Sequence, residues 1–142
     1  MCGGVEFEVQ GIPVKVYFPN PEAKLPVKTK SGDLQMVPWG RRKEQVSKLP
    51  MGGWARLDSI ENGTWEKYAP IPVKIKISRF MEKDKHRTSH WFELKTQEFL
   101  QGLLVQNKDE QRVYVVTVDS ASDNSIHDRW PRIINENLNN EK

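Results

Sequence analysis

Apolar and polar residues alternate with a period of two in short stretches along most of this 142-residue chain. The first two stretches, 5–9 and 12–18, flank a Gln10-Gly11 turn and predict a hairpin. A helical pattern is confined to one stretch around 59–68. Further strands are expected at 25–27, 34–37, 72–80, 89–94, 98–105 and 113–118. Strands at such regular intervals, with turn residues between them, predict a mainly β, α+β fold: a sheet-rich pseudo-barrel with few short helices.

The chain length fits one domain, which we expect to span residues 1–134, followed by a polar and flexible tail at 135–142. The longest apolar runs are too short to span a membrane, and no charged-then-apolar leader suggests export. A single cysteine excludes an intramolecular disulfide and fits a reducing cytoplasm. The net charge of +3 and the pI near 9.0 permit a polyanionic partner without requiring one.

Motifs for nucleotide or metal chemistry are missing from the sequence. It contains neither a phosphate-binding GxxxxGK[ST] loop nor a GxGxxG fingerprint. His86 and His90 are four residues apart, but the surrounding pattern is that of a strand and no third ligand is nearby. We therefore expect no cofactor and no metal.

The lone cysteine, Cys2, directly follows the initiator methionine. Removal of Met1 would leave a 1,2-aminothiol, whose amine has a pKa of ~8 and whose thiol has a pKa of ~8.5. Such a pair reacts with an aldehyde: the amine forms an imine, and the thiol closes on the imine carbon to give a thiazolidine. The predicted strand from Val5 would anchor this end. The simpler alternative is that a lone cysteine near the start of a chain has no role.

Two polar residues are candidates for proton transfer. Glu82 follows two large apolar residues at the end of the predicted strand, where burial would raise the pKa of its carboxyl group. More often, a glutamate in this position is simply exposed. His127 precedes Asp128 and Arg129 in a loop closed by a proline; it titrates near physiological pH, and Arg129 could bind a phosphate or hold Asp128.

A tryptophan between a proline and a glycine, Trp39, precedes the cations Arg41, Arg42 and Lys43. This pattern suits a stacking platform with a rim that faces phosphates. It equally suits a loop tryptophan that caps the core, with a solvated basic run behind it.

Six segments occur in an order that resembles the SOS-response-associated peptidase family, the abasic-site-processing proteins. They are Met1-Cys2-Gly3, 20–27, Trp39-Gly40, 55–59, Phe80-Met81-Glu82 and 126–131. The resemblance runs from Cys2 to about Ile134, and this chain looks like a short, divergent form. Its specific elements are the Cys-Gly pair at the second position and the HDRxP pattern at 127–131.

The resemblance implies covalent capture of abasic sites in single-stranded DNA during the DNA damage response, through a thiazolidine on Cys2. It implies Met1 removal, by the protein's own peptidase activity or by an aminopeptidase, and could add lyase activity. We expect a cytoplasmic monomer that associates with the nucleoid when on DNA. The resemblance implies catalytic roles for Cys2, Glu82 and His127. With the local pattern, it places Arg56, Trp39, Trp54, Arg129, Arg41 and Arg42 in contact with DNA.

Departures from the family pattern keep other functions open. Gly4 stands where the family usually has arginine, Trp54 replaces an asparagine that holds the reacting centre, Asp58 shortens a glutamate, and Lys83 replaces an aromatic residue. Indole has one donor and no acceptor, so Trp54 could stack on a base but not replace the amide. The alternatives are a single-strand-binding module without chemistry and, least favoured, a peptidase acting on other proteins.

Overall fold

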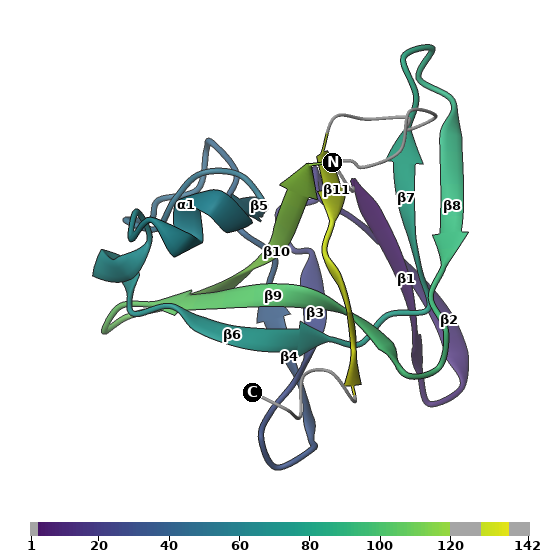
Figure 1. Ribbon diagram of the computed structural model, residues 1–142, viewed down its shortest axis with the longest axis horizontal. Coiled ribbons are helices and arrows are strands. Elements are labelled where there is room, and N and C mark those ends of the chain that lie inside the picture. The colour runs from purple at the N-terminus through teal and green to yellow at the C-terminus, as the bar shows by residue number, and fades with distance from the viewer. Residues whose placement is uncertain (1–2, 120–128, 137–142) are drawn as a thin grey trace.

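A computed structural model describes residues 3–119 and 129–136 of the chain, which form two β-sheets and little helix (Figure 1). The small sheet has the order β2-β1-β7-β8 and the large sheet contains the other eight strands. The mainly β, α+β fold predicted from the sequence is therefore confirmed. The strands of the small sheet are β1 (Gly4–Val9), β2 (Ile12–Tyr17), β7 (Arg79–Lys83) and β8 (Ser89–Glu93).

The large sheet follows the order β11-β10-β9-β6-β3-β4, with β12 paired to β9 and β5 paired to β10. Its strands are β3 (Lys24–Lys28), β4 (Leu34–Pro38), β5 (Trp54–Arg56), β6 (Ile71–Ile75), β9 (Glu98–Gln106), β10 (Gln111–Asp119), β11 (Arg129–Pro131) and β12 (Ile133–Asn135). A parallel bridge between Trp39 and Val113 joins the chain after β4 to β10. The large sheet thus curls back on itself.

The first hairpin forms as predicted, with Val9 paired to Ile12 across the turn. Gln10 and Gly11 have φ angles of 52° and 81°. A two-residue type I′ turn needs positive φ at both positions, and its twist matches that of the flanking strands. The turn therefore fixes the register of β1 and β2.

The single strand predicted over 72–80 is wrong. The chain leaves the large sheet after Ile75 and re-enters strand structure at Arg79, in the small sheet. Ile77 lies in this crossing and is 4% exposed, so the apolar alternation continues through the break. A period-two pattern reports which side chains face the core, but not which sheet contains the strand.

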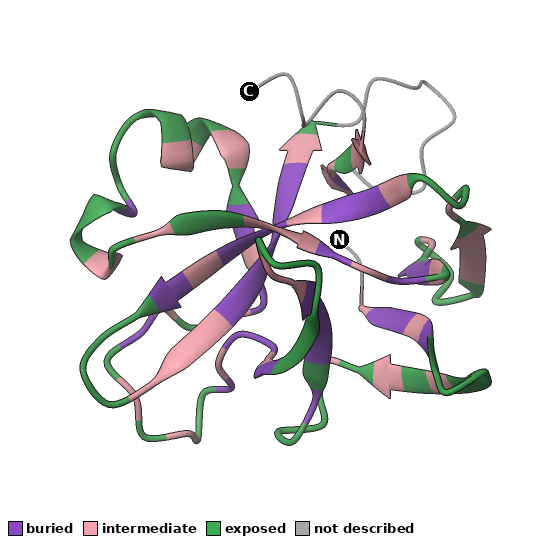
Figure 2. Cartoon of the chain, turned by 90° about the horizontal axis from the view of Figure 1, so that it is seen from below, coloured by how far each residue is buried: buried purple, intermediate pink, exposed green. Residues whose placement is uncertain are grey.

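Two clusters of buried side chains form the core. The first joins the two sheets and includes Val5, Phe7 and Phe80 from the small sheet, and Leu25 and Leu100 from the large one. The second packs the large sheet against the segment that contains α1 (Leu57–Glu61) and the 3-10 helix η1 (Glu66–Tyr68). These two short elements replace the single helix expected around 59–68. Figure 2 shows buried positions along the central strands and exposed positions in the connecting loops.

The ordered fold extends beyond the boundary predicted at residue 134. Asn135 belongs to β12, and the Glu136 amide donates a hydrogen bond to the Gln97 carbonyl at 3.0 Å. The Lys28 ammonium group also contacts the Glu136 carboxylate at 2.8 Å. The remainder of the predicted tail, 137–142, lies outside the described residues. In the described parts of the chain, no helix combines the length and the apolar character needed to cross a membrane.

Candidate functional site

Glu82 lies on β7, between the neighbouring strands β1 and β8 of the small sheet. It is 0% exposed, and Phe80 and Met81 beside it are buried as well. Burial raises the pKa of the Glu82 carboxyl group, and the charge of the chain's amino terminus opposes this rise. A carboxyl with a raised pKa is suited to donate and accept protons near neutral pH. Of the two sequence interpretations, the structure supports the buried glutamate.

The chain enters the small sheet at Gly3, next to the strand that carries Glu82. The Gly3 amide donates to the Met81 carbonyl at 3.1 Å, and the Gly3 carbonyl accepts from the Phe18 amide at 3.1 Å. Cys2 itself lies outside the described residues. The residue that follows Cys2 in the chain is therefore hydrogen-bonded to the strand that carries Glu82.

His127 also lies outside the described residues, and β11 begins two residues after it, at Arg129. Trp130 of β11 packs against Phe80 and Phe92 of the small sheet, with ring centroids 5.4 and 5.0 Å apart. Trp130, three residues after His127 in the chain, therefore contacts the strand that carries Glu82. In Figure 1 the start of β1 and the start of β11 lie at the same end of the molecule.

Two arginines predicted to contact DNA flank the end of β10. Arg56 is exposed and makes a bidentate pair with Asp58, with distances of 3.1 and 3.0 Å. The hydrogen bond from Arg56 is the main cause of the lowered pKa of Asp58. The Arg129 guanidinium contacts the Asp119 carboxylate at 2.5 Å and the Thr117 carbonyl at 2.8 Å, and its side chain is 13% exposed. Arg56 is therefore accessible to a phosphate, whereas Arg129 is held against β10.

The predicted stacking platform at Trp39 is wrong. Trp39 is 0% exposed, and its Nε1 donates to the Gly53 carbonyl at 3.0 Å. Arg42, predicted to contact DNA, is 6% exposed and donates to the carbonyls of Phe18, Trp39 and Asn20 at 2.6, 2.5 and 2.7 Å. The alternative of a core-capping tryptophan is correct, because the loop folds inward around these contacts. Trp39 and Arg42 offer no surface for a phosphate or a base.

Trp54 and Arg41 are intermediate in exposure, less buried than Trp39 and Arg42 and less exposed than Arg56. Trp54 is partly buried on β5, and its ring packs against Phe18 with centroids 4.8 Å apart. Arg41 is also partly buried, and its Nε donates to the Gln45 carbonyl at 3.1 Å. The stacking of Trp54 on a base and the phosphate contact of Arg41 stay predictions.

A histidine and an aspartate beside Glu82 are additions that the sequence interpretation missed. His90 on β8 is the direct cross-strand partner of Glu82. The Asp84 carboxylate contacts His90 Nε2 at 2.8 Å. The sequence could have indicated this pair, because a hairpin whose turn is centred on His86 places position 90 directly opposite position 82. Within residues 3–119 and 129–136, no group of three or more side chains is arranged to hold a metal ion.

A cavity of about 630 Å³ lies elsewhere on the molecule. Its lining carries charges of both signs, among them those of Glu6, Lys76 and Arg79, and Glu82 does not line it. The Arg79 and Glu6 side chains also form an ion pair with each other. We therefore treat this cavity as separate from the Glu82 site.

Comparison of the sequence with models of known protein families finds no match. Comparison with curated proteins finds none either. The functional interpretation therefore depends on the residues of this chain and on their arrangement.

Proposed function

We propose that this protein captures abasic sites in single-stranded DNA by a covalent bond to Cys2, as a short, divergent member of the SOS-response-associated peptidase family. One observation carries the proposal. Gly3 is hydrogen-bonded to Met81 at 3.1 Å, and the next residue, Glu82, is a fully buried carboxyl whose pKa is raised by burial. The residue that follows the aminothiol is thus bound to the strand that carries an acid–base group.

The chemistry needs proton transfers at each step. Removal of Met1, by the protein itself or by an aminopeptidase, frees the Cys2 amine. The amine adds to the ring-opened aldehyde and expels water to give an imine. The thiol then adds to the imine carbon, forming a C–S bond, and its proton moves to the ring nitrogen. Glu82, with His127, would supply and accept protons during opening of the sugar and closure of the thiazolidine. A lyase activity would follow from β-elimination at the imine.

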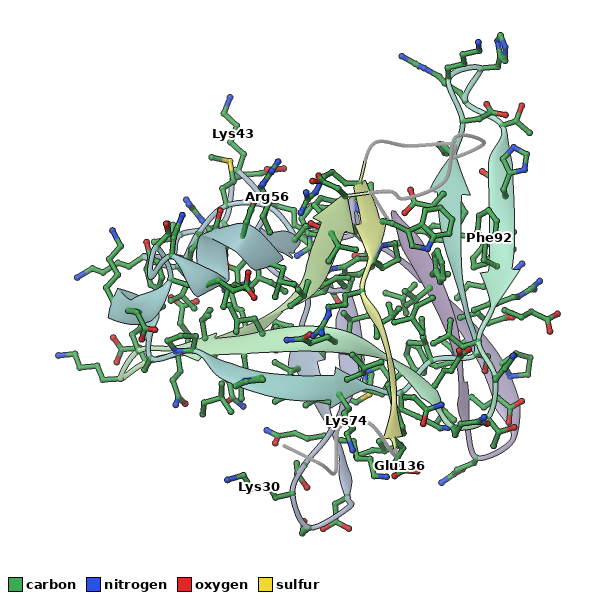
Figure 3. The ribbon with its side chains drawn as sticks, in the orientation of Figure 1. Lys30, Lys43, Arg56, Lys74, Phe92 and Glu136 are labelled. Carbon is green, nitrogen blue, oxygen red and sulfur yellow. The ribbon has the colours of Figure 1, made fainter. Side chains whose placement is uncertain are left out.

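Exposed cations near this end of the molecule support a DNA partner. Arg56 lies on one side, as labelled in Figure 3, and the β7–β8 hairpin carries exposed Lys83 at the end of β7 and exposed Lys85 and Arg87 in its turn. Cations at such positions can contact successive phosphates of a single strand. We propose that the protein acts in the cytoplasm, because a free thiol needs a reducing compartment.

The test is a mixture of the mature protein with a single-stranded oligonucleotide that carries one abasic site. We expect a shifted band that survives heating in denaturant and that is abolished by Cys2→Ala. Prior reduction of the aldehyde with borohydride should prevent the band, and an intact oligonucleotide of the same sequence is the matched control. A wild-type protein that leaves no stable band refutes covalent capture.

Gly4 favours a second candidate, a single-strand-binding module without chemistry. A Cβ atom at this position would lie 2.9 Å from the Tyr17 ring and 3.2 Å from the Met81 side chain. A longer side chain, such as the arginine usual in the family, would require Tyr17 to move. Equal binding of intact and abasic DNA, without a stable band, would select this candidate.

A further inference from the structure

His90 and Glu82 are direct partners in the antiparallel ladder of β7 and β8. Opposite residues in such a ladder project from the same face, with Cβ atoms roughly 4.5–5.5 Å apart. Two positions away on each strand, Phe80 and Phe92 stack with a centroid distance of 5.4 Å. This stacked pair is consistent with the β7–β8 register and shows that Phe80 and Phe92 project from the same face of the small sheet as Glu82 and His90. His90 therefore leaves the sheet beside Glu82, on the side that Trp130 covers.

Asp84 fixes the His90 ring from the hairpin turn. One carboxylate oxygen of Asp84 contacts His90 Nε2 at 2.8 Å, and the other accepts the amides of His86 and Thr88 at 2.8 and 2.9 Å. The His90 contact is the largest cause that lowers the pKa of Asp84, to about 2. An ionised carboxylate can only accept, so Nε2 carries the hydrogen and Nδ1 holds the lone pair of the neutral ring. The turn thus presents an imidazole with one defined acceptor.

Glu82 and His90 differ sharply in their access to water. Glu82 is 0% exposed, whereas the His90 side chain is 41% exposed. A buried carboxyl that gains and loses protons in each reaction cycle needs a route to solvent. Among the described residues, Glu82 and Asp84 are the ionisable groups that the register and the hydrogen bonds place beside His90. Asp84 is ionised and holds the ring, so Glu82 is the group with a proton to exchange.

We propose that His90, oriented by Asp84, carries protons between Glu82 and solvent during abasic-site capture. The proposal rests on the proposed function. In the outward direction, the Glu82 O–H bond breaks and the proton passes through one water to Nδ1, where an N–H bond forms and gives an imidazolium held by Asp84. That N–H bond then breaks, and the proton passes to water. The same steps in reverse order return a proton to the Glu82 carboxylate. His90 acts through Glu82 and does not touch DNA.

The test is the single-turnover rate of capture of an oligonucleotide with one abasic site, measured from pH 5 to 9. We expect His90→Ala to slow capture roughly tenfold or more, since a general acid–base group contributes 10²–10⁴-fold. DNA affinity should stay within about twofold. His86→Ala, at the exposed tip of the same hairpin, is the matched control and should keep the wild-type rate.

Rescue distinguishes proton transfer from a structural role. Imidazole and related buffers should restore the rate of His90→Ala in proportion to their concentration, with a rescue that follows the buffer pKa, and should not change the wild-type rate. If His90→Ala does not fold, Asp84→Asn carries the test. Asparagine still accepts the turn amides through its oxygen but can donate to Nε2, so the pH optimum should shift.

Each outcome decides the inference. Wild-type capture that His90→Ala leaves unchanged overturns the role of His90 and leaves the proposed function standing. A slow His90→Ala variant that no buffer rescues also overturns it. A wild-type protein that captures no abasic DNA overturns both proposals.

Discussion

Arg42 provides the most quantitative test of the fold around the candidate site. Its guanidinium donates three hydrogen bonds to backbone carbonyls, at 2.6, 2.5 and 2.7 Å, and lies 4.1 Å from the centroid of the Phe18 ring. The three carbonyls belong to Phe18, Trp39 and Asn20, so one side chain ties the loop after β2 to the loop after β4. We expect Arg42→Ala to destabilise the fold, because it leaves these acceptors without their donor.

The size of the effect follows from the number of contacts. A hydrogen bond to a charged group contributes about 1.5–3 kcal/mol. Three such bonds do not add fully, because water enters the space that the side chain leaves. A buried acceptor left without a donor costs about 1–3 kcal/mol, and for these three carbonyls we expect a total of about 3–5 kcal/mol. For a chain of this length, about 4 kcal/mol corresponds to a fall in Tm of roughly 8–16 °C.

Urea denaturation followed by tryptophan fluorescence measures this change. With an m-value of about 2 kcal/mol/M, the midpoint should fall by roughly 2 M. The control is Lys43→Ala, at the exposed neighbouring position, which should stay within about 0.5 kcal/mol of the wild type. Arg42→Lys keeps the charge but not the planar guanidinium group, so its loss of stability should lie between those of Lys43→Ala and Arg42→Ala. A loss below about 1 kcal/mol in Arg42→Ala, or equal losses in Arg42→Ala and Lys43→Ala, would refute the structural role.

Three further predictions concern the site and its surroundings. Burial raises the folded-state pKa of Glu82 above the usual 4.5, so the stability it contributes is complete below that pH and is lost as pH rises through the folded value. By urea midpoint, Glu82→Gln should therefore be more stable than the wild type at pH 7 to 8 and should lose this advantage towards pH 4. A stability advantage that grows on acidification would contradict the burial argument. The same variant should slow capture more than it weakens DNA affinity. Arg56→Gln should weaken single-strand binding and lower the slope of log K against log salt by about 0.7, whereas Lys74→Gln, at the opposite end in Figure 3, should not. Gly53→Ala would place a Cβ atom 2.6 Å from the Phe18 ring and 2.8 Å from Trp39 Nε1, so thermal denaturation should show a loss of about 1–3 kcal/mol.

The parts of the fold that sequence predicted well are those fixed by neighbouring residues. The hairpin of β1 and β2 follows from period-two alternation on both sides of Gln10-Gly11, a turn whose two positive φ angles are satisfied locally. The strand that became β10 was predicted at 113–118 from its apolar run after the turn at 107–110, and it is longer than expected, Gln111–Asp119. Local patterns were sufficient here because each element's own residues determine its geometry.

Long-range contacts explain where the sequence interpretation failed. Trp39 and Arg42 stand in a stretch of proline, glycine and cations that is typical of a solvated loop, but carbonyls from Phe18 and Asn20 accept the arginine and Gly53 accepts the indole. Those acceptors come from segments 14 to 24 residues away. Glu82 was selected from its position after two apolar residues, yet its burial depends on β1 and β8 on either side of it. Charge and polarity alone could not separate a buried arginine from an exposed one.

The crossing between the sheets at 76–78 determines what can meet at the candidate site. It takes the chain from β6 in the large sheet to β7 in the small one, where Met81 pairs with the segment that follows Cys2. The segment that follows His127 returns from the large sheet, and its Trp130 ring packs on Phe80 of the same strand. The three proposed catalytic residues therefore depend on contacts between the sheets and not on any one element. Detachment of the small sheet would separate Glu82 from Trp130, so capture should be lost before the large sheet unfolds.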